Sequence, residues 1–160
     1  MRSPISTVTN SKSVNGAFGY QVVNQLLRAI AERLKQHLRP GDVLCRVGED
    51  EFCFGLKNIY ATGELTDWIN GVMGSFTEAF QIENCDIFMS VCMGIALDTE
   101  VNSNAEALLQ AADTAMYKAK GRGKGCHQIF NREMTAATLK RLTLETDLQR
   151  AIAQQEFSRN

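Results

Sequence analysis

The stretch RVGEDEFCFGL, residues 46–56, decides the fold of this sequence. It places three consecutive acids, Glu49, Asp50 and Glu51, between a glycine and an apolar run. Acidic side chains are depleted in β-strands, yet the residues on either side alternate between polar and apolar as strands do. Residues 43–47 and 51–56 are therefore expected to pair as a β-hairpin that carries the acids at its tip.

Strand and helix patterns alternate through the rest of the chain. Apolar residues recur at helical spacing along residues 21–38, and the following RPG ends this stripe because proline cannot continue a helix. Asn104 is the expected N-cap of a helix over residues 104–125. The other predicted elements are a strand at 5–9, a helix at 64–80, a buried central strand at 86–97, a short strand at 126–130 and an amphipathic helix at 134–157. This order predicts an α/β fold, an α+β sandwich in which helices flank a central mixed β-sheet.

The composition limits the class of protein. The 160 residues include 17 basic and 18 acidic side chains, so no broad attraction to nucleic acid or to an anionic membrane is expected. No apolar stretch approaches the length of a membrane span, which predicts no membrane segment in this chain. Cys45, Cys53 and Cys92 lie within apolar runs, where cysteine is expected to be buried. The odd total of five cysteines, with no CxxC pair, favours a reducing, cytoplasmic location.

Taken in order, these segments resemble the GGDEF family of diguanylate cyclases, which join two GTP molecules into cyclic di-GMP. The resemblance covers about residues 5–130, and AADTAMYKAKGRGKG, residues 111–125, is its most specific part beside the hairpin. It implies the palm-like fold of nucleotidyl cyclases. Residues 1–133 are expected to form this domain without the family's usual N-terminal helix. Residues 134–160 resemble the helical linker that enters a cyclic di-GMP phosphodiesterase (EAL) domain.

The resemblance implies a metal-dependent site. In the family, a carboxylate on the first strand and another at the hairpin tip share a divalent metal, which neutralises charge while a 3′-hydroxyl attacks an α-phosphate. Asp50 and Glu51 stand at the catalytic positions of the tip, with Asp50 as the metal ligand. Thr7 stands where the first-strand aspartate would, and a neutral hydroxyl is a weak ligand for magnesium. Mg²⁺ is therefore implied only as the companion of bound GTP, with its contact through Thr7 weak or lost.

The family's nucleotide contacts are retained in part. Gly48 matches the first tip glycine, which lets a phosphate approach the backbone closely. Asn15 matches the asparagine that reads guanine, whereas Asn24 replaces its aspartate partner and loses an acceptor for the guanine N–H groups. Lys120 matches a phosphate-binding lysine, and Lys124 stands where the family has an arginine.

Glu49 takes the position of the family's second tip glycine. It adds bulk and a negative charge beside the expected triphosphate. Two like charges about 4 Å apart cost roughly 4 kcal/mol at an effective dielectric near 20, unless the side chain turns outward. Together, Glu49 and Thr7 favour loss of the cyclase reaction and leave Asp50 and Glu51 as remnants of the catalytic site.

The motif RPGD supplies a second candidate site. Arg39 and Asp42 match the RxxD pair with which the family grips cyclic di-GMP at an inhibitory site just before the hairpin. The spacing alone is a weak pattern, and its position upstream of the hairpin gives it weight. The alternative is a surface ion pair beside a turn.

Three functions stay open from the sequence. The first is a degenerate GGDEF module that binds GTP, cyclic di-GMP or both and regulates an attached EAL phosphodiesterase. The second is an active diguanylate cyclase that tolerates Thr7 and Glu49. The third is a ligand-free dimerisation or docking domain, so the enzymatic status and a homodimer are both left open.

Overall fold

The computed structural model describes residues 5–10, 19–98, 104–131 and 143–155. The chain divides into two compact units, Met1–Phe130 and Asn131–Asn160. The first unit holds every strand described here. In the second, residues 143–155 are helical, which falls within the helix predicted at 134–157, while 134–142 and 156–157 lie outside the described residues. None of the helices in the described ranges combines the length and apolar character needed to cross a membrane.

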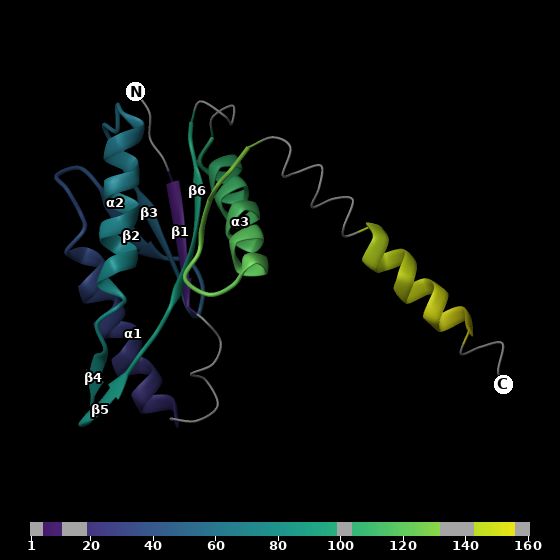
Figure 1. Cartoon of the computed structure of the whole chain (residues 1–160), viewed down its shortest axis with the longest axis horizontal. Coiled ribbons are helices and arrows are strands. Elements are labelled where there is room, and N and C mark those ends of the chain that lie inside the picture. Colours follow the sequence, from purple (N-terminus) through teal and green to yellow (C-terminus); the bar gives the residue numbers. More distant parts are fainter. Residues whose placement is uncertain (1–4, 11–18, 99–103, 132–142, 156–160) are drawn as a thin grey trace. The chain divides into compact units, whose positions relative to one another are not determined.

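A five-stranded mixed sheet forms the centre of the first unit (Figure 1). The strand order is β2-β3-β1-β6-β7, and only β6 and β7 run parallel. The predicted α/β class with a central mixed sheet is confirmed. The strands are β1 (Ile5–Asn10), β2 (Val43–Arg46), β3 (Glu51–Gly55), β6 (Val91–Ala96) and β7 (His127–Ile129).

Three helices and a small second sheet complete this unit. Figure 1 shows α3 on one side of the sheet and α1 and α2 on the other. The bounds are α1 (Gly19–Lys35), α2 (Thr62–Ser75), α3 (Ala105–Arg122), and the paired strands β4 (Phe80–Ile82) and β5 (Cys85–Ile87).

The main core lies between the sheet and the pair α1 and α2. Side chains at alternate positions of β3 and β6 are buried with the apolar stripes of both helices, because a strand presents every second residue to one face. Phe54 is fully buried and meets the indole of Trp68 edge to face, with ring centroids 4.8 Å apart. The core members from these elements are Leu26, Ile30, Leu34, Phe52, Phe54, Leu65, Ile69, Val72, Phe76, Val91, Met93 and Ile95.

Arg33 joins the end of α1 to the segment after α2. Its Nη1 donates to the carbonyls of Ser75 at 3.0 Å and Glu78 at 2.6 Å, and its Nη2 donates to Ala79 at 3.1 Å. The guanidinium also stacks 3.6 Å from the centre of the Phe80 ring. One side chain thus satisfies three carbonyls where the chain leaves α2 and enters β4.

The opposite face of the sheet is covered by α3, which contacts β6, β1 and β7. Most of its buried residues are alanines, and Ala112, Ala115 and Ala119 have no exposed area. Gly94 of β6 lies directly beneath them. A Cβ at Gly94 would overlap the Ala112 carbonyl and the Met116 amide nitrogen, so only glycine permits this close approach.

Two predicted element boundaries are wrong. The helix predicted at 64–80 ends at Ser75, and Phe80 instead begins β4. The strand predicted at 86–97 is divided into β5 and β6, which belong to different sheets. Glu83 and Asn84 both have positive φ, 49° and 64°, as a two-residue hairpin turn requires, so β5 folds back onto β4.

The remaining predicted elements of this unit are present. The hairpin strands and the strands at residues 5–9 and 126–130 appear as β2, β3, β1 and β7. The helix predicted at 21–38 starts at Gly19 and ends at Lys35. The helix predicted at 104–125 ends at Arg122, and its predicted cap is confirmed because Asn104 Oδ1 accepts from the Ala107 amide at 2.7 Å.

We predict that Gly94→Ala lowers the free energy of unfolding by about 3 kcal/mol, since the new methyl group forces α3 away from β6. Urea denaturation followed by circular dichroism measures this change. Gly63→Ala is the matched control, because a Cβ in that first turn of α2 meets nothing within 4 Å. The control is expected to be neutral or slightly stabilising. Equal destabilisation by the two variants would contradict the packing argument.

Candidate nucleotide-binding site

The acidic hairpin tip is held by Arg46, the last residue of β2. Its Nε donates to the Gly48 carbonyl at 3.0 Å and its Nη2 donates to the Glu49 carbonyl. The Val47 amide donates to the Glu51 carbonyl at 2.9 Å, which continues the ladder beyond β2. Arg46 therefore holds the backbone of the hairpin tip in one conformation.

The three acids of the tip differ in exposure. Glu49 is exposed, whereas Asp50 and Glu51 are half-buried. The Glu51 side chain packs against Gly48, where an added Cβ would come within 3.3 Å of the Glu51 Cβ and Oε2. Gly48 thus makes room for Glu51, and the charge of Glu49 lies toward solvent.

The strand register places Glu51 at one end of the sheet and Thr7, the predicted first-strand position, in the middle of β1. Thr9 of β1 stands opposite both Glu51 of β3 and Cys92 of β6. Thr7 stands two residues deeper, opposite Cys53 and Gly94. The side chains of β1 are not described, and Asn15 lies outside the described residues, so their roles stay predictions.

Few of the described carboxylates at this end of the sheet could hold a metal ion. Among the described residues, no group of three or more His, Cys, Asp or Glu side chains is placed to hold a metal ion. Asp50 and Glu51 offer hard oxygen ligands of the kind Mg²⁺ takes, but Thr7, the predicted first-strand ligand, has only a neutral hydroxyl. The residues therefore fit a magnesium ion only in part.

The loop after α3 reaches the same end of the sheet. The Met93 amide donates to the Cys126 carbonyl at 3.0 Å, and the Cys92 thiol donates to the Gly123 carbonyl at 3.5 Å. Gly123 and Gly125 have φ of 134° and 67°, values open to glycine, and between them they place Lys124 at the bend.

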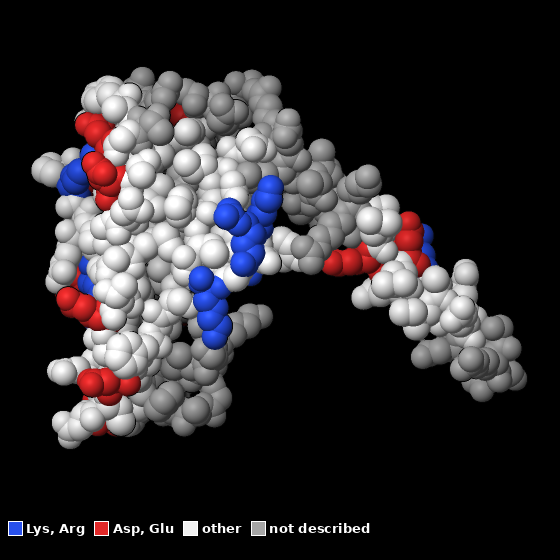
Figure 2. All heavy atoms as spheres, in the orientation of Figure 1, with Lys and Arg blue, Asp and Glu red and all other residues white. Residues whose placement is uncertain are grey.

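Basic side chains gather around this bend (Figure 2). They lie over the C-terminal half of α3 and the loop that follows it, in a region where Lys120 and Lys124 are both exposed. The two predicted phosphate-binding lysines thus belong to one basic segment. The α3 C-terminus also favours cations, because the helix dipole places partial negative charge at that end.

A groove of about 390 Å³ lies between α1 and the hairpin. Asn24, the predicted base-contacting residue, lines it, and Arg28, Lys35 and Arg46 contribute three cationic side chains. Its remaining lining is largely apolar and comes from Leu27, Ala31, Leu44, Cys45 and Phe52. Such a surface suits a flat apolar base joined to an anion.

The sequence reasoning named Asn24 but missed the cations of this groove. Asn24, Arg28 and Lys35 are spaced by four and seven residues, which places them on one face of α1. This polar stripe lies beside the apolar stripe of the same helix, and it was the feature of the sequence from which the groove cations could have been predicted.

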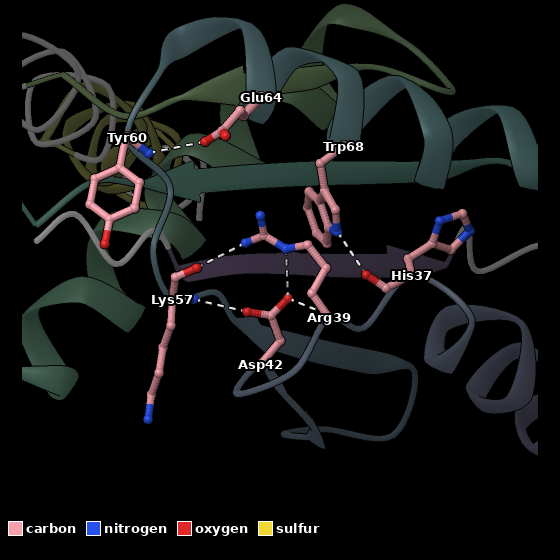
Figure 3. A network of polar contacts seen from close by, with 7 residues as sticks. All are labelled: His37, Arg39, Asp42, Lys57, Tyr60, Glu64 and Trp68. Carbon is pink, nitrogen blue, oxygen red and sulfur yellow. Dashed lines mark hydrogen bonds and ion pairs between the residues drawn. The ribbon is translucent and has the colours of Figure 1, made fainter.

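The predicted inhibitory pair forms a closed network (Figure 3). Asp42 Oδ2 accepts from the Arg39 backbone amide at 3.0 Å and from Arg39 Nε at 3.1 Å. Asp42 Oδ1 accepts from the Lys57 amide at 2.9 Å, while Arg39 Nη2 donates to the Lys57 carbonyl at 2.9 Å. The Asp42 side chain is 1% exposed, against 39% for Arg39.

This network ties the turn after α1 to the chain leaving β3. Burial alone would raise the pKa of Asp42, but the hydrogen bonds from Lys57 and Arg39 and the Arg39 charge lower it overall. Both Asp42 oxygens are engaged within the chain. The role of Lys57 could not be foreseen, because only its backbone takes part.

Comparison with known proteins agrees with this geometry. The family model described as "Diguanylate cyclase, GGDEF domain" matches residues 6–126. The chain belongs to the GGDEF family. The matched segment includes the hairpin, the groove, the whole of α3 and, apart from Ile5 and β7, the central sheet.

Several relatives share this GGDEF domain. The chain is 34% identical over 89% of its length to the cyclic di-GMP phosphodiesterase PdeR of Escherichia coli K12. It is 29% identical over 91% of its length to the bifunctional diguanylate cyclase/cyclic di-GMP phosphodiesterase MucR of Pseudomonas aeruginosa. These matches span only 22% and 21% of the two relatives. The chain thus spans about a fifth of the length of these curated relatives.

A solved structure of an EAL/GGDEF domain protein from M. capsulatus superimposes with a TM-score of 0.76. The two sequences are 32% identical, and the match covers 81% of this chain and 85% of that one. The fold of this GGDEF domain is therefore that of its family.

We predict that Asp42→Asn destabilises the domain by about 2 kcal/mol at neutral pH, because hydrogen bonds to a charged group are replaced by weaker ones. The folded pKa of Asp42 lies below its ordinary value of 3.8. Its contribution is therefore complete above that value and is lost as the pH falls through the folded pKa. Urea denaturation at several pH values should show the difference from wild type shrinking below about pH 4.

The exposed Asp67→Asn serves as the control for this series. It is expected to leave stability within about 0.5 kcal/mol of wild type. A difference between Asp42→Asn and wild type that stayed constant down to the lowest pH would contradict the role given to the ionised Asp42.

Proposed function

We propose that this GGDEF domain is a regulatory module that binds GTP in the groove between α1 and the hairpin without joining two GTP molecules into cyclic di-GMP. The observation that carries the proposal is the groove itself, with an apolar lining, Asn24 and three cations. Its chemistry matches a purine nucleotide, whose base is flat and whose phosphates are anionic.

The fixed geometry of the hairpin is compatible with GTP binding. Arg46 holds the tip backbone, and Glu49 lies exposed, so its charge is screened by water. Lys120 and Lys124 supply exposed cations at the end of the sheet where the tip lies. Asp50 would hold the Mg²⁺ that accompanies GTP, and the ion would supply positive charge against the phosphates.

Loss of catalysis rests on two positions. Thr7 replaces the first-strand carboxylate and leaves the metal with fewer anionic ligands. Glu49 replaces a glycine and adds a like charge near the site of phosphoryl transfer. An active diguanylate cyclase is the alternative, and a ligand-free dimerisation or docking domain is the third reading.

Cyclic di-GMP is the second proposed ligand, at Arg39. That residue is 39% exposed in its side chain and could contact a ligand, whereas Asp42 would have to leave the Lys57 amide to do so. GTP in the groove is therefore the ligand that the contacts favour.

The wider setting is a cytoplasmic cyclic di-GMP signalling protein. Two relatives are named as cyclic di-GMP phosphodiesterases, one of them bifunctional, and a solved neighbour is named an EAL/GGDEF domain protein. We propose that residues 134–160 link this domain to an EAL phosphodiesterase that it regulates, in a protein that can form a homodimer.

Calorimetry with GTP and Mg²⁺, and separately with cyclic di-GMP, tests the proposal. GTP is expected to bind, and Arg28→Ala is expected to weaken that binding about tenfold, or about 1.4 kcal/mol, by removing a groove cation. Arg150→Ala, in the separate helical unit, is the matched control and should leave affinity unchanged. Glu49→Gly is expected to strengthen binding only slightly, because the charge that it removes is exposed and screened by water.

The same samples are assayed for cyclic di-GMP after incubation with GTP. No product is expected from the wild-type protein. Accumulation of cyclic di-GMP would overturn the regulatory proposal in favour of the active cyclase, and absence of heat with either nucleotide would favour the docking domain.

We further predict that GTP changes the rate of cyclic di-GMP hydrolysis by the full-length protein. Such coupling is expected if the nucleotide binds one state of the regulated enzyme more tightly and the two states hydrolyse cyclic di-GMP at different rates. The hydrolysis rate is measured with and without GTP in wild type, Arg28→Ala and Arg150→Ala. If the hydrolysis rate of all three proteins does not change with GTP although GTP is bound, the regulatory role is contradicted, and the proposed GTP binding still stands.

A further inference from the structure

Two cysteines face each other across the hairpin. Cys45 of β2 and Cys53 of β3 are direct partners in the antiparallel register. Cys45 is exposed, contrary to the burial expected from sequence, whereas Cys53 is 5% exposed. β2 is the edge strand of the sheet, so solvent reaches the outer thiol while the inner one is covered.

The backbone geometry of this pair suits a covalent link. The Val47 amide bonds the directly opposite Glu51 carbonyl, and hydrogen-bonded pairs recur at every second position of an antiparallel ladder. Cys45 and Cys53 therefore occupy a hydrogen-bonded pair, in which the Cα atoms lie about 5.5 Å apart. Disulfides most often join Cα atoms at about 5.5–6 Å.

We propose that Cys45 and Cys53 form a redox-sensitive dithiol that closes to a cross-strand disulfide under hydrogen peroxide. The Cys45 thiolate attacks one peroxide oxygen, forming an S–O bond as the O–O bond breaks, and the released hydroxide takes up a proton to become water. The Cys53 sulfur then attacks the Cys45 sulfur. The S–S bond forms, the S–O bond breaks, and the Cys53 proton leaves with the hydroxide as a second water.

The two thiols have different parts in this sequence. Burial, together with the neighbouring Cys45 thiol and the Asp113 carboxylate, raises the pKa of Cys53 to about 12. Because Cys45 is exposed and Cys53 is covered, peroxide reaches Cys45 first and Cys53 is the resolving thiol. Closing the bond draws the opposite Cβ atoms together from about 5 Å to about 4 Å, and β2 is the strand that has to shift, since in the described sheet it pairs along one side only.

The other cysteines have different surroundings. Cys92 and Cys126 direct their thiols to the carbonyls of Gly123 and Lys124. Cys85 is exposed in β5, opposite Ile82. Cys85 supplies a matched control, since it is as accessible as Cys45 but has no cysteine as its cross-strand partner.

Peptide mapping tests the proposal without any nucleotide. The reduced protein is treated with hydrogen peroxide, its free thiols are alkylated, and it is digested with trypsin. Cleavage after Lys35, Arg46 and Lys57 separates residues 36–46 from residues 47–57. The expected product is these two peptides joined with loss of two hydrogens, and dithiothreitol should release them.

Three variants sharpen the outcome. Cys45→Ser, a surface change, should abolish the linked peptide, and Cys53→Ala should leave Cys45 as a sulfenic or sulfinic acid. Cys85→Ser should leave the yield unchanged. A Cys45–Cys53 link that is absent from the folded protein, or no more abundant there than after oxidation in denaturant, would overturn the proposal.

Discussion

The close contact between Gly94 and α3 is the constraint on which the rest of this domain depends. Because β6 has no side chain at that position, the helix backbone rests directly on the sheet. The small side chains of α3 suit this approach and leave no space to absorb an added methyl group. The position of the helix along β6 in turn fixes where its C-terminus delivers Lys120 and Lys124.

The two faces of the sheet are stabilised by different means. The face toward α1 and α2 is a conventional core of branched and aromatic side chains. The face toward α3 relies on backbone proximity and small residues. The predicted functional residues lie between these two faces, at the end of the sheet that holds Glu51 and Cys92. A substitution at the hairpin tip can therefore abolish the reaction without disrupting the fold of the domain.

The sequence predicted the elements whose patterns are local. The hairpin, α1 and α3 were recognisable from alternation, helical spacing and the Asn104 cap. The β4–β5 hairpin was not, because each of its strands has only three residues, and Phe80 and Ile87 also fit the helix and the strand predicted on either side. Contacts between backbone atoms far apart in the sequence could not be predicted either. Lys57 closes the Arg39–Asp42 network through main-chain atoms, which no residue-type pattern can indicate.

Arg33 has a consequence for how this domain moves. It bonds carbonyls at Ser75, Glu78 and Ala79 from a single planar group, so these contacts are made and broken together. Lysine could not replace it, since a point charge cannot span three acceptors in that fork. The end of α1, the end of α2 and the start of β4 should therefore open as one cooperative unit, with their amides becoming accessible to solvent in the same event. The second sheet would then loosen as a block while the central sheet stays closed.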